Sequence, residues 1–331
     1  MKKIVSIVLA VSMLAVCVTG CKTTTRKQLK PVVLNEVAHS IFYAPQYAAI
    51  ELGYFEDEGL DLTLVNGAGA DKVMTALISG DADIGFMGSE ASIYVYQQGS
   101  DDYAVNFAQL TQRAGNFLVG REAQDNFTWA DLKGKKVLGG RAGGMTEMVF
   151  EYILKKNGID PAADLTIDQS INFGLTAAAF TSNDADYTVE FEPFATGLEK
   201  EGNGHVIASL GVDSGYVPYT AYSVKKSYLE KNPETIQKFT NAIQKGLEYV
   251  NTHSAEEIAK VIQPQFKETD EDTIATIVGR YKDQDTWKGD TVFEKDSFEL
   301  LENILEEAGE LNERVPYDKL VTTEFSQEAA K

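Results

Sequence analysis

Apolar residues alternate along this chain between runs of strand length and segments with helical spacing. A β-branched run over residues 31–37 predicts a strand, and Pro45 then begins a segment whose apolar positions share one face of a helix. Gly53 and Gly59 end that segment before an extended pattern resumes over residues 60–65. The order strand, helix, strand predicts a βαβ unit, and in such units ligands collect outside the carboxyl ends of the strands.

The same alternation continues along the chain. Asp71 can cap a helix that ends at Gly80, and a short strand ending in glycine follows over residues 81–88. Further strands are expected at residues 105–111, 117–119, 137–138, 165–171 and 187–191, and further helices at residues 89–98, 145–153, 175–180 and 193–200. Repeated alternation of this kind predicts an α/β fold class, with sheets flanked by helices.

The carboxyl-terminal part of the chain differs because helical spacing dominates it. Residues 220–224 form the last expected strand, which could return the chain to the lobe that its first strands and helices form. Asn232 and Pro233 supply a cap and a first-turn proline for the next helix, and Ser254 with Glu257 matches a capping box. We expect these helices to contribute packing rather than a functional site.

Glycine and proline between residues 211 and 218 mark the expected end of a second lobe. We therefore expect a first lobe made of residues 31–110 together with residues 218–331, and a second lobe made of residues 111–217. A chain of 331 residues is long enough to bury two cores.

The amino terminus matches a bacterial lipoprotein signal. Lys2 and Lys3 precede an apolar run of about 15 residues, shorter than the roughly 20 that a membrane-spanning helix needs. Small residues then lead to Cys21, where lipidation requires a cysteine. We expect a signal peptide over residues 1–20, a lipid on Cys21 and a flexible tether over residues 21–30, which would hold the protein at the outer face of the cell membrane. The alternative is an uncleaved anchor or an accidental hydrophobic leader.

Composition narrows the classes of function. The chain has 50 acidic residues against 30 basic ones, a formal net charge of -20 that repels nucleic acid. Cys17 and Cys21 are its two cysteines, and Cys17 lies within the expected leader, so we expect no disulfide. The sequence contains no HExxH, GxSxG or Walker lysine motif, and it predicts neither a metal nor a cofactor.

Five short motifs occur in order along the chain: residues 39–45 (HSIFYAP), 51–55 (ELGYF), 58–61 (EGLD), 76–85 (ALISGDADIG) and 131–136 (DLKGKK). Together they resemble the solute-binding proteins of ABC importers, in the branch that handles nitrate, aliphatic sulfonates and pyrimidine precursors of thiamine. The resemblance implies a two-lobed fold of the periplasmic-binding-protein type II with a cleft between the lobes. It also implies a monomer that serves permease and ATPase subunits.

In a two-lobed binding protein the strand ends that face the cleft supply the ligand-binding groups. The expected first wall consists of His39, Ser40, Tyr43, Gly67, Gly88, Ser89 and Glu90. The expected second wall consists of Arg141, Gly143, Gly144, Met145, Thr146, Asn172, Glu190 and Glu192. Tyr219 is an aromatic residue that could stack on a flat ring.

Three of these residues carry alternative interpretations. Arg141 beside a glycine-rich helix start suits an anion, and an ordinary exposed arginine is the alternative. The resemblance places Glu192 near the cleft, where its carboxylate would accept hydrogen bonds from a ring amine; the alternative is that it caps the helix that begins at Pro193. His39 could pair with polar ring atoms or be a plain strand-end residue.

The combination of acid, histidine and aromatic residues favours a planar, amine-bearing heterocycle, such as a hydroxymethyl- or formylamino-pyrimidine precursor of thiamine. We expect the protein to capture this molecule and deliver it without chemistry. An aliphatic sulfonate, nitrate or other small anion is the alternative ligand, although it would call for more arginines.

Two other functions are weighed against the importer. A pyrimidine synthase that resembles this fold uses a lysine-bound cofactor and a cysteine-rich iron motif, but no cysteine follows Cys21 in this chain. A binding protein that serves a sensor without a transporter has the same sequence features as an importer component.

Overall fold

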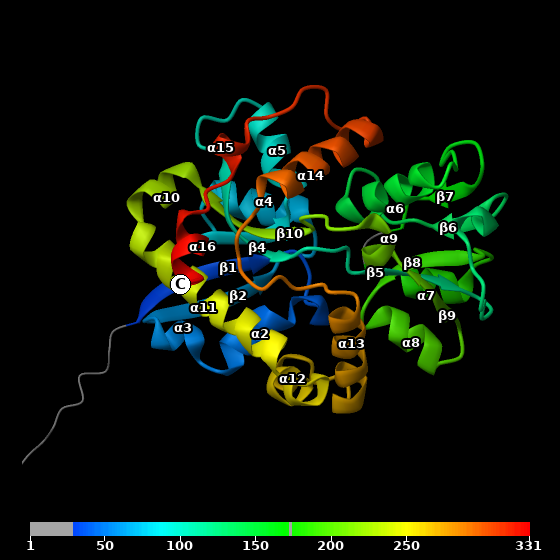
Figure 1. Cartoon of the computed structure of the whole chain (residues 1–331), viewed down its shortest axis with the longest axis horizontal. Coiled ribbons are helices and arrows are strands. Elements are labelled where there is room, and N and C mark those ends of the chain that lie inside the picture. The colour runs from blue at the N-terminus through cyan, green and yellow to red at the C-terminus, as the bar shows by residue number, and fades with distance from the viewer. Residues whose placement is uncertain (1–28, 172–173) are drawn as a thin grey trace, which may run out of the picture.

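The computed structural model describes residues 29–171 and 174–331, which form two α/β lobes side by side (Figure 1). Within these ranges, each lobe is built on one five-stranded sheet. The first sheet has the strand order β2-β1-β3-β10-β4, and the second has the order β7-β6-β8-β5-β9.

Both sheets are mixed. The strands of the first sheet are β1 (Lys30–Glu36), β2 (Leu60–Asn66), β3 (Ile84–Gly88), β4 (Ala104–Thr111) and β10 (Thr220–Lys225). Those of the second are β5 (Asn116–Gly120), β6 (Lys136–Leu138), β7 (Thr166–Asp168), β8 (Tyr187–Phe191) and β9 (His205–Ser209). β1 is parallel to β2 and β3, whereas β10 is antiparallel to β3 and β4. β6 is parallel to β7 and β8, whereas β5 is antiparallel to β8 and β9. The predicted α/β class and the predicted βαβ unit are both confirmed.

Helices flank both sheets. Before the second lobe they are η1 (Ile41–Tyr43), α2 (Ala44–Glu51), α3 (Tyr54–Asp57), α4 (Ala70–Ser79) and α5 (Glu90–Gln97). In the second lobe they are η2 (Trp129–Leu132), α6 (Met145–Lys156), α7 (Thr176–Ser182), α8 (Phe194–Lys200) and α9 (Leu210–Ser214). After β10 they are α10 (Lys226–Lys231), α11 (Pro233–Thr252), α12 (Ala255–Ile262), η3 (Gln263–Gln265), α13 (Glu271–Asp283), α14 (Lys295–Ala308), α15 (Tyr317–Leu320) and α16 (Glu324–Ala329).

The longest of these helices, α11, was predicted from the spacing of its apolar residues. The apolar face of α11 is completely buried, including Ile236, Phe239 and Ile243, and Pro233 occupies its first turn as predicted. A Cβ at Gly246 would lie 2.2 Å from the carbonyl oxygen of Pro45, so glycine lets α11 cross α2 closely. The capping box predicted for the following helix, α12, is confirmed.

Three sequence-based expectations need correction. The predicted cap of α4 is wrong, because Gly69 is its N-cap and Asp71 lies in its first turn. β9 and α9 were not predicted; β9 is the edge strand of the second sheet, and its side chains are exposed or half-buried, so it lacks a buried apolar run. The short helices α3, α10, α15 and α16 were also missed because each is too short to show a helical period.

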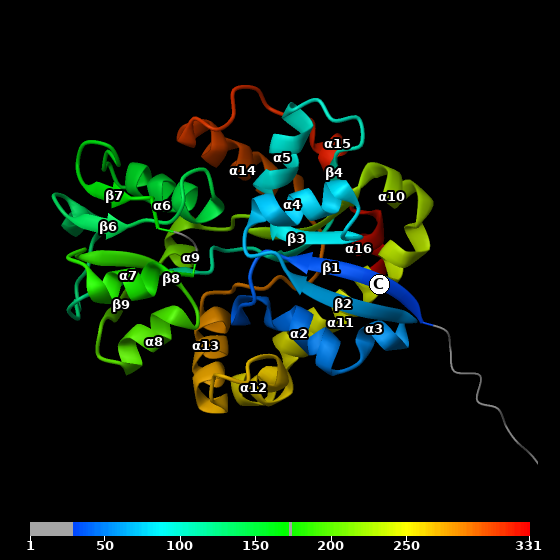
Figure 2. The same ribbon diagram turned by 180° about the vertical axis from the view of Figure 1, so that it is seen from behind.

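The carboxyl-terminal helices reach the second lobe from two sides of the molecule (Figures 1 and 2). α14 packs against α6 at one side, and Lys155 Nζ donates a hydrogen bond to the carbonyl oxygen of Glu307 at 2.6 Å. α13 lies at the other side, where Arg280 pairs with Glu192 and Glu199. Residues far apart in the chain therefore hold the two lobes in their relative positions.

Nowhere in residues 29–171 and 174–331 is a helix both long enough and apolar enough to span a bilayer.

Candidate functional site

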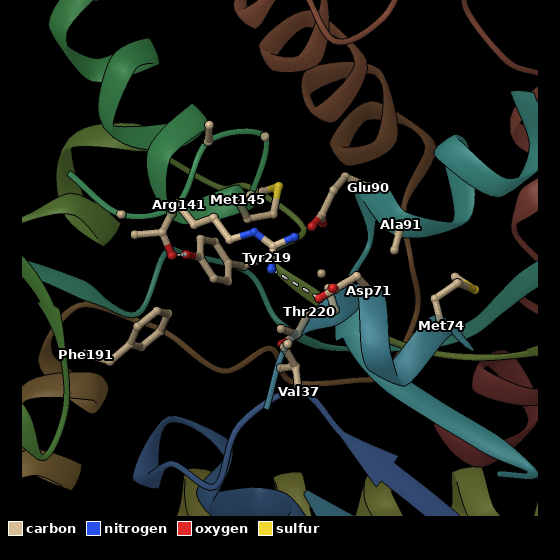
Figure 3. Close-up of a pocket in the computed structure, with 18 of the residues that line it drawn as sticks. Val37, Asp71, Met74, Glu90, Ala91, Arg141, Met145, Phe191, Tyr219 and Thr220 are labelled. Carbon is tan, nitrogen blue, oxygen red and sulfur yellow. Dashed lines mark hydrogen bonds and ion pairs between the residues drawn. The ribbon is translucent and has the colours of Figure 1, made fainter. Parts of the chain in front are cut away.

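A cavity of about 710 Å³ lies between the lobes, at the carboxyl ends of the parallel strands. Val37 lines it directly after β1, Gly88 at the end of β3, and Gly140 after β6. Helices α4, α5 and α6 begin at its wall, with Asp71, Glu90 and Met145 among the lining residues (Figure 3). The βαβ topology therefore places loop and first-turn residues of both lobes around one space.

Most of the residues expected at the site line this cavity. Ten of them do: Tyr43, Gly88, Glu90, Arg141, Gly143, Gly144, Met145, Thr146, Glu190 and Tyr219. Asn172 lies outside the described residues. The others, which are His39, Ser40, Gly67, Ser89 and Glu192, do not line it.

Glu90 is the charged group most deeply set in the first wall. It is 4% exposed, and its Oε2 atom is buried without a hydrogen-bond partner in the described structure. Burial raises the pKa of its carboxyl to about 7, although the backbone N–H of Glu90 itself opposes the shift. A Cβ at Gly88 would lie 2.1 Å from Oε2, so any larger residue at this strand end would force the Glu90 carboxyl to move.

Three tyrosines surround this part of the cavity. Burial is the main cause that raises the pKa values of Tyr43, Tyr94 and Tyr219, and the charge of Glu90 raises each of them further. All three tyrosines line the cavity together with Glu90. The Tyr219 hydroxyl donates a hydrogen bond to Asn116 Oδ1 at 2.7 Å, while Asn116 Nδ2 is buried and has no partner in the described structure.

The second wall also contains a buried carboxyl, but both of its oxygens have partners. Glu190 is 1% exposed, and it accepts hydrogen bonds from Thr188 Oγ1 at 2.6 Å and from Thr176 Oγ1 at 2.9 Å. Burial nevertheless raises its pKa to about 7, because the two hydroxyls only partly offset the desolvation.

The glycine-rich turn before α6 already faces carboxylates of the protein. Gly143 N donates to Glu147 Oε2 at 3.1 Å, and burial raises the pKa of Glu147 to about 8. Arg141 Nη1 lies 3.3 Å from Asp71 Oδ1, and both side chains are more than half exposed. This pair joins the two lobes beside the cavity (Figure 3).

His39 makes structural contacts instead of lining the cavity. Its Nδ1 lies 2.8 Å from Glu36 Oε1, its Nε2 lies 2.9 Å from the carbonyl oxygen of Gln265, and its ring stacks on Phe266. The hydrogen bond with Glu36 raises the pKa of His39. Both nitrogens face acceptors, so the imidazole links the end of β1 to η3.

Glu192 also has protein partners. Thr196 donates to it from its backbone nitrogen and from its hydroxyl, each at 2.9 Å, and Arg280 Nη1 donates at 2.9 Å. These contacts match the alternative interpretation, in which Glu192 caps the start of α8, and they add an ion pair to it.

The remaining expected residues hold strand ends in place. Ser40 Oγ donates to the carbonyl oxygen of Glu192 at 2.9 Å, so it joins the lobes. Ser89 Oγ donates to the carbonyl oxygen of Pro218. A Cβ at Gly67 would lie 2.6 Å from Asn35 Oδ1, so this glycine permits close packing beside β1.

Several lining residues were not predicted at the site. They include Asp71, Met74, Asn116 and Phe194. Asn116 had a detectable signal, since it is a polar residue that starts the otherwise apolar strand β5. Met74 had none, because it belongs to an apolar helix face that predicts packing alone. Within the described residues, no group of three or more His, Cys, Asp or Glu side chains could hold a metal ion.

The chain matches the model of the family described as NMT1/THI5 like over residues 41–257. It is 46% identical over 308 residues to YtlA of Bacillus subtilis (strain 168), whose provisional name describes a binding protein, and the match spans 93% of this chain and 92% of YtlA. It is 26% identical over 229 residues to the yeast enzyme 4-amino-5-hydroxymethyl-2-methylpyrimidine phosphate synthase THI11 from Saccharomyces cerevisiae, and the match spans 63% of each chain.

Among solved structures, the chain is similar to the alkanesulfonate-binding protein SsuA from Xanthomonas axonopodis pv. citri, which was solved bound to MOPS. The TM-score is 0.71, with 14% identical residues, and the similarity covers 89% of this chain and 99% of SsuA. This similarity shows that the two chains share the two-lobed periplasmic-binding-protein fold.

Proposed function

This chain belongs to the NMT1/THI5-like family, and from that premise we propose that it is the solute-binding component of an ABC importer. It captures a small molecule in the cavity between its lobes and delivers it to the permease unchanged. The observation that carries the proposal is the interlobe cavity of about 710 Å³, which lies within the size range of small-molecule clefts and is lined by both lobes.

The extent of the similarity supports binding rather than synthesis. YtlA matches almost the whole chain at 46% identity, whereas the yeast synthase matches 63% of it at 26% identity. The pyrimidine synthase that resembles this fold uses a cysteine-rich iron motif. This chain lacks such a motif, because its two cysteines are Cys17 and Cys21. Enzymatic activity is therefore the less supported alternative.

The charges around the cavity favour a ligand with N–H donors over a lone anion. Asp71 and Glu147 lie in the first turns of α4 and α6, and Glu90 begins α5, so the starts of these three helices already have a carboxyl group where an anion would bind. Arg141 is the one basic residue among the described lining residues, and it pairs with Asp71. We therefore favour a pyrimidine precursor of thiamine as the ligand, and an aliphatic sulfonate or nitrate as the alternative.

The proposed cellular role follows from the proposed anchoring. A lipid on Cys21 and a tether over residues 21–30 would keep a monomer at the outer face of the membrane, next to its permease. The first lobe would comprise residues 31–110 and 218–331, and the second residues 111–217. Permease and ATPase genes beside its own gene would distinguish an importer component from a binding protein that serves a sensor.

A melting-temperature screen of the purified protein tests the proposal. The compounds are 4-amino-5-hydroxymethyl-2-methylpyrimidine, its formylamino counterpart, taurine and nitrate. A ligand at a hundred times its Kd stabilises the folded state by about 2.7 kcal/mol, so we expect a clear rise with a pyrimidine. Mass spectrometry of the recovered compound should show it unchanged.

Other results would correct the proposal in different ways. A rise with taurine but with neither pyrimidine would reverse the order of the two ligand classes. Conversion of the pyrimidine into another compound would replace the binding function with an enzymatic one.

A further inference from the structure

The Glu90 carboxyl stands in an unusual position for a charged group. Only 4% of the Glu90 residue is exposed to solvent, and its Oε2 atom has no hydrogen-bond partner among the described residues. Figure 3 shows the carboxyl pointing into the space near Arg141, Met145 and Tyr219. A buried carboxylate oxygen without a partner is costly, which indicates that a group from outside the protein pairs with it.

The protein itself supplies no cation to Glu90. No ion pair of Glu90 is formed within the part of the chain that the structure describes, and Arg141 pairs with Asp71 at 3.3 Å instead. The raised pKa of Glu90 has the same cause, since burial is its largest contribution and no neighbouring cation opposes it. The partner that Glu90 lacks is therefore a hydrogen-bond donor or a positive charge from outside the described residues.

The surroundings of Glu90 suit an organic cation rather than a metal ion. Tyr43, Tyr94 and Tyr219 line the same cavity as Glu90. Aromatic faces attract ammonium groups through the quadrupole of the ring, and a carboxylate among several aromatic rings is a suitable setting for a substituted ammonium. A metal ion would need further oxygen or nitrogen ligands, which the described residues do not gather.

The rest of the cavity suits an apolar body attached to that charge. Met74 and Met145 line it with flexible, polarisable side chains. Ile78 and Phe194, which are 37% and 41% exposed, line it from opposite lobes. A volume of about 710 Å³ leaves room for a ring beside the charged group.

We propose that the ligand of this cavity is an organic cation, whose charged nitrogen binds Glu90 among the three tyrosines while its ring lies against the apolar wall. The inference rests on the proposed solute-binding function and names the substrate class of the same site. A protonated amine, a quaternary ammonium and an aminopyrimidine protonated on its ring all belong to this class. Asn116 Nδ2, which is buried and unpaired in the described structure, would donate to an acceptor on the same ligand.

A series of compounds that share one ring and differ in the charge of one group tests the proposal. The probes are benzylamine and benzyltrimethylammonium as cations, benzyl alcohol as the neutral compound and phenylmethanesulfonate as the anion. Calorimetry on the purified protein should show that the cations bind about 30-fold or more tightly than the alcohol, as expected for a buried charge pair, and that the sulfonate does not bind.

Two variants show whether Glu90 is responsible. Glu90→Gln keeps the size of the side chain but removes its charge, and it should abolish the preference for the cations over benzyl alcohol. Glu302→Gln is the matched control, because Glu302 is a carboxyl that is 3% exposed and lies outside the cavity, where it accepts a hydrogen bond from Val315 N at 2.8 Å. The control should keep the preference, and melting curves show that both variants are folded.

Each remaining outcome overturns the assignment. Binding of the alcohol or the sulfonate as tightly as the cations would do so and would leave the solute-binding function standing. A preference that survives Glu90→Gln would remove Glu90 from the site. Binding of none of the four probes would also overturn the assignment, while the pyrimidine and sulfonate screen decides the proposed function separately. If Glu90→Gln does not fold, the series on the unchanged protein still decides the charge of the ligand.

Discussion

The two walls of the cavity each contain one deeply buried carboxyl, and their surroundings differ. Glu190 of the second lobe has a threonine hydroxyl on each oxygen, both from its own lobe. Glu90 of the first lobe has an oxygen without a partner in the described structure. Burial raises both pKa values to about 7. Equal burial therefore does not imply an equal role, because Glu190 has its partners within the second lobe and Glu90 keeps an acceptor available.

Two of the ion-paired contacts between the lobes differ in the same way. At one side Arg280 of α13 lies between Glu192 and Glu199, and the Glu192 side chain is fully buried. At the other side Arg141 and Asp71 form a single pair with both side chains more than half exposed. Electrostatic attraction is strong only where water is excluded. We therefore regard the α13 contact as structural and the Arg141 contact as readily broken.

Arg280→Ala should have the largest effect, because it leaves the buried carboxyl of Glu192 without its cation. Removing one partner of a buried pair costs several kcal/mol, and since Arg280 is partly exposed we expect a loss of about 3 kcal/mol in the free energy of unfolding. Urea denaturation at pH 7 measures it. A loss no larger than that of Arg141→Ala would show that the two contacts are equivalent.

The pH dependence of stability comes next in size. The carboxyls of Glu90 and Glu190 have an ordinary pKa of 4.5, and burial raises both to about 7. Between these values the folded protein holds protons that the unfolded chain releases, so this contribution to stability is fully present below about pH 4.5 and is lost as the pH rises through about 7. Glu90→Gln cannot ionise and should reduce the loss by on the order of 2 kcal/mol.

Urea denaturation at several pH values between 4.5 and 8 measures this effect. Glu190→Gln should flatten the curve by a similar amount, since the two carboxyls lie in different lobes and titrate independently. An unchanged slope in both variants would contradict the raised pKa values.

Gly88→Ala tests the space that the first wall provides. A Cβ there would lie 2.1 Å from Glu90 Oε2, so the carboxyl must move, and we expect a destabilisation of about 1–2 kcal/mol together with weaker ligand binding. Gly144→Ala in the second wall is the matched control, because the nearest atom to its Cβ would be 3.4 Å away. Melting temperatures and calorimetry measure both variants, and equal effects would show that the two walls tolerate side chains equally.

Arg141→Ala should change the free energy of unfolding by no more than about 0.5 kcal/mol, because its pair with Asp71 is exposed to solvent. Urea denaturation at low and high salt measures the change, which should vanish at high salt. A loss comparable to that of Arg280→Ala would mean that the Arg141 contact is buried in solution.

Much of the architecture could be predicted from local patterns. The apolar face of α11 and the capping box of α12 depend on residues close together in the chain, and both are confirmed. β9 could not be predicted, because an edge strand with exposed side chains carries no buried apolar run. The candidate site was predicted by a topological rule, which identifies strand ends but not the direction in which each side chain points.

The strand-end residues show the limit of that rule. His39 and Glu90 both follow strands of the first sheet, yet His39 contacts Glu36 and Gln265 while Glu90 lines the cavity. Gln265 is 226 positions from His39 in the chain, so the local sequence could not predict this contact. Glu192 is similar, since its partner Arg280 lies 88 positions away.

By itself, the sequence determined the α/β class, the order of most elements, the family resemblance and the acidic character of the chain, because these depend on composition, short-range periodicity and ordered motifs. Only the tertiary structure decided which carboxyls have partners and which do not. The physical reason is that hydrogen bonding and desolvation are set by atoms within a few ångströms of a group, and in this protein those atoms come from segments that are distant in sequence. Glu90 and Glu190 have the same side chain and nearly the same burial, and their neighbours alone distinguish them.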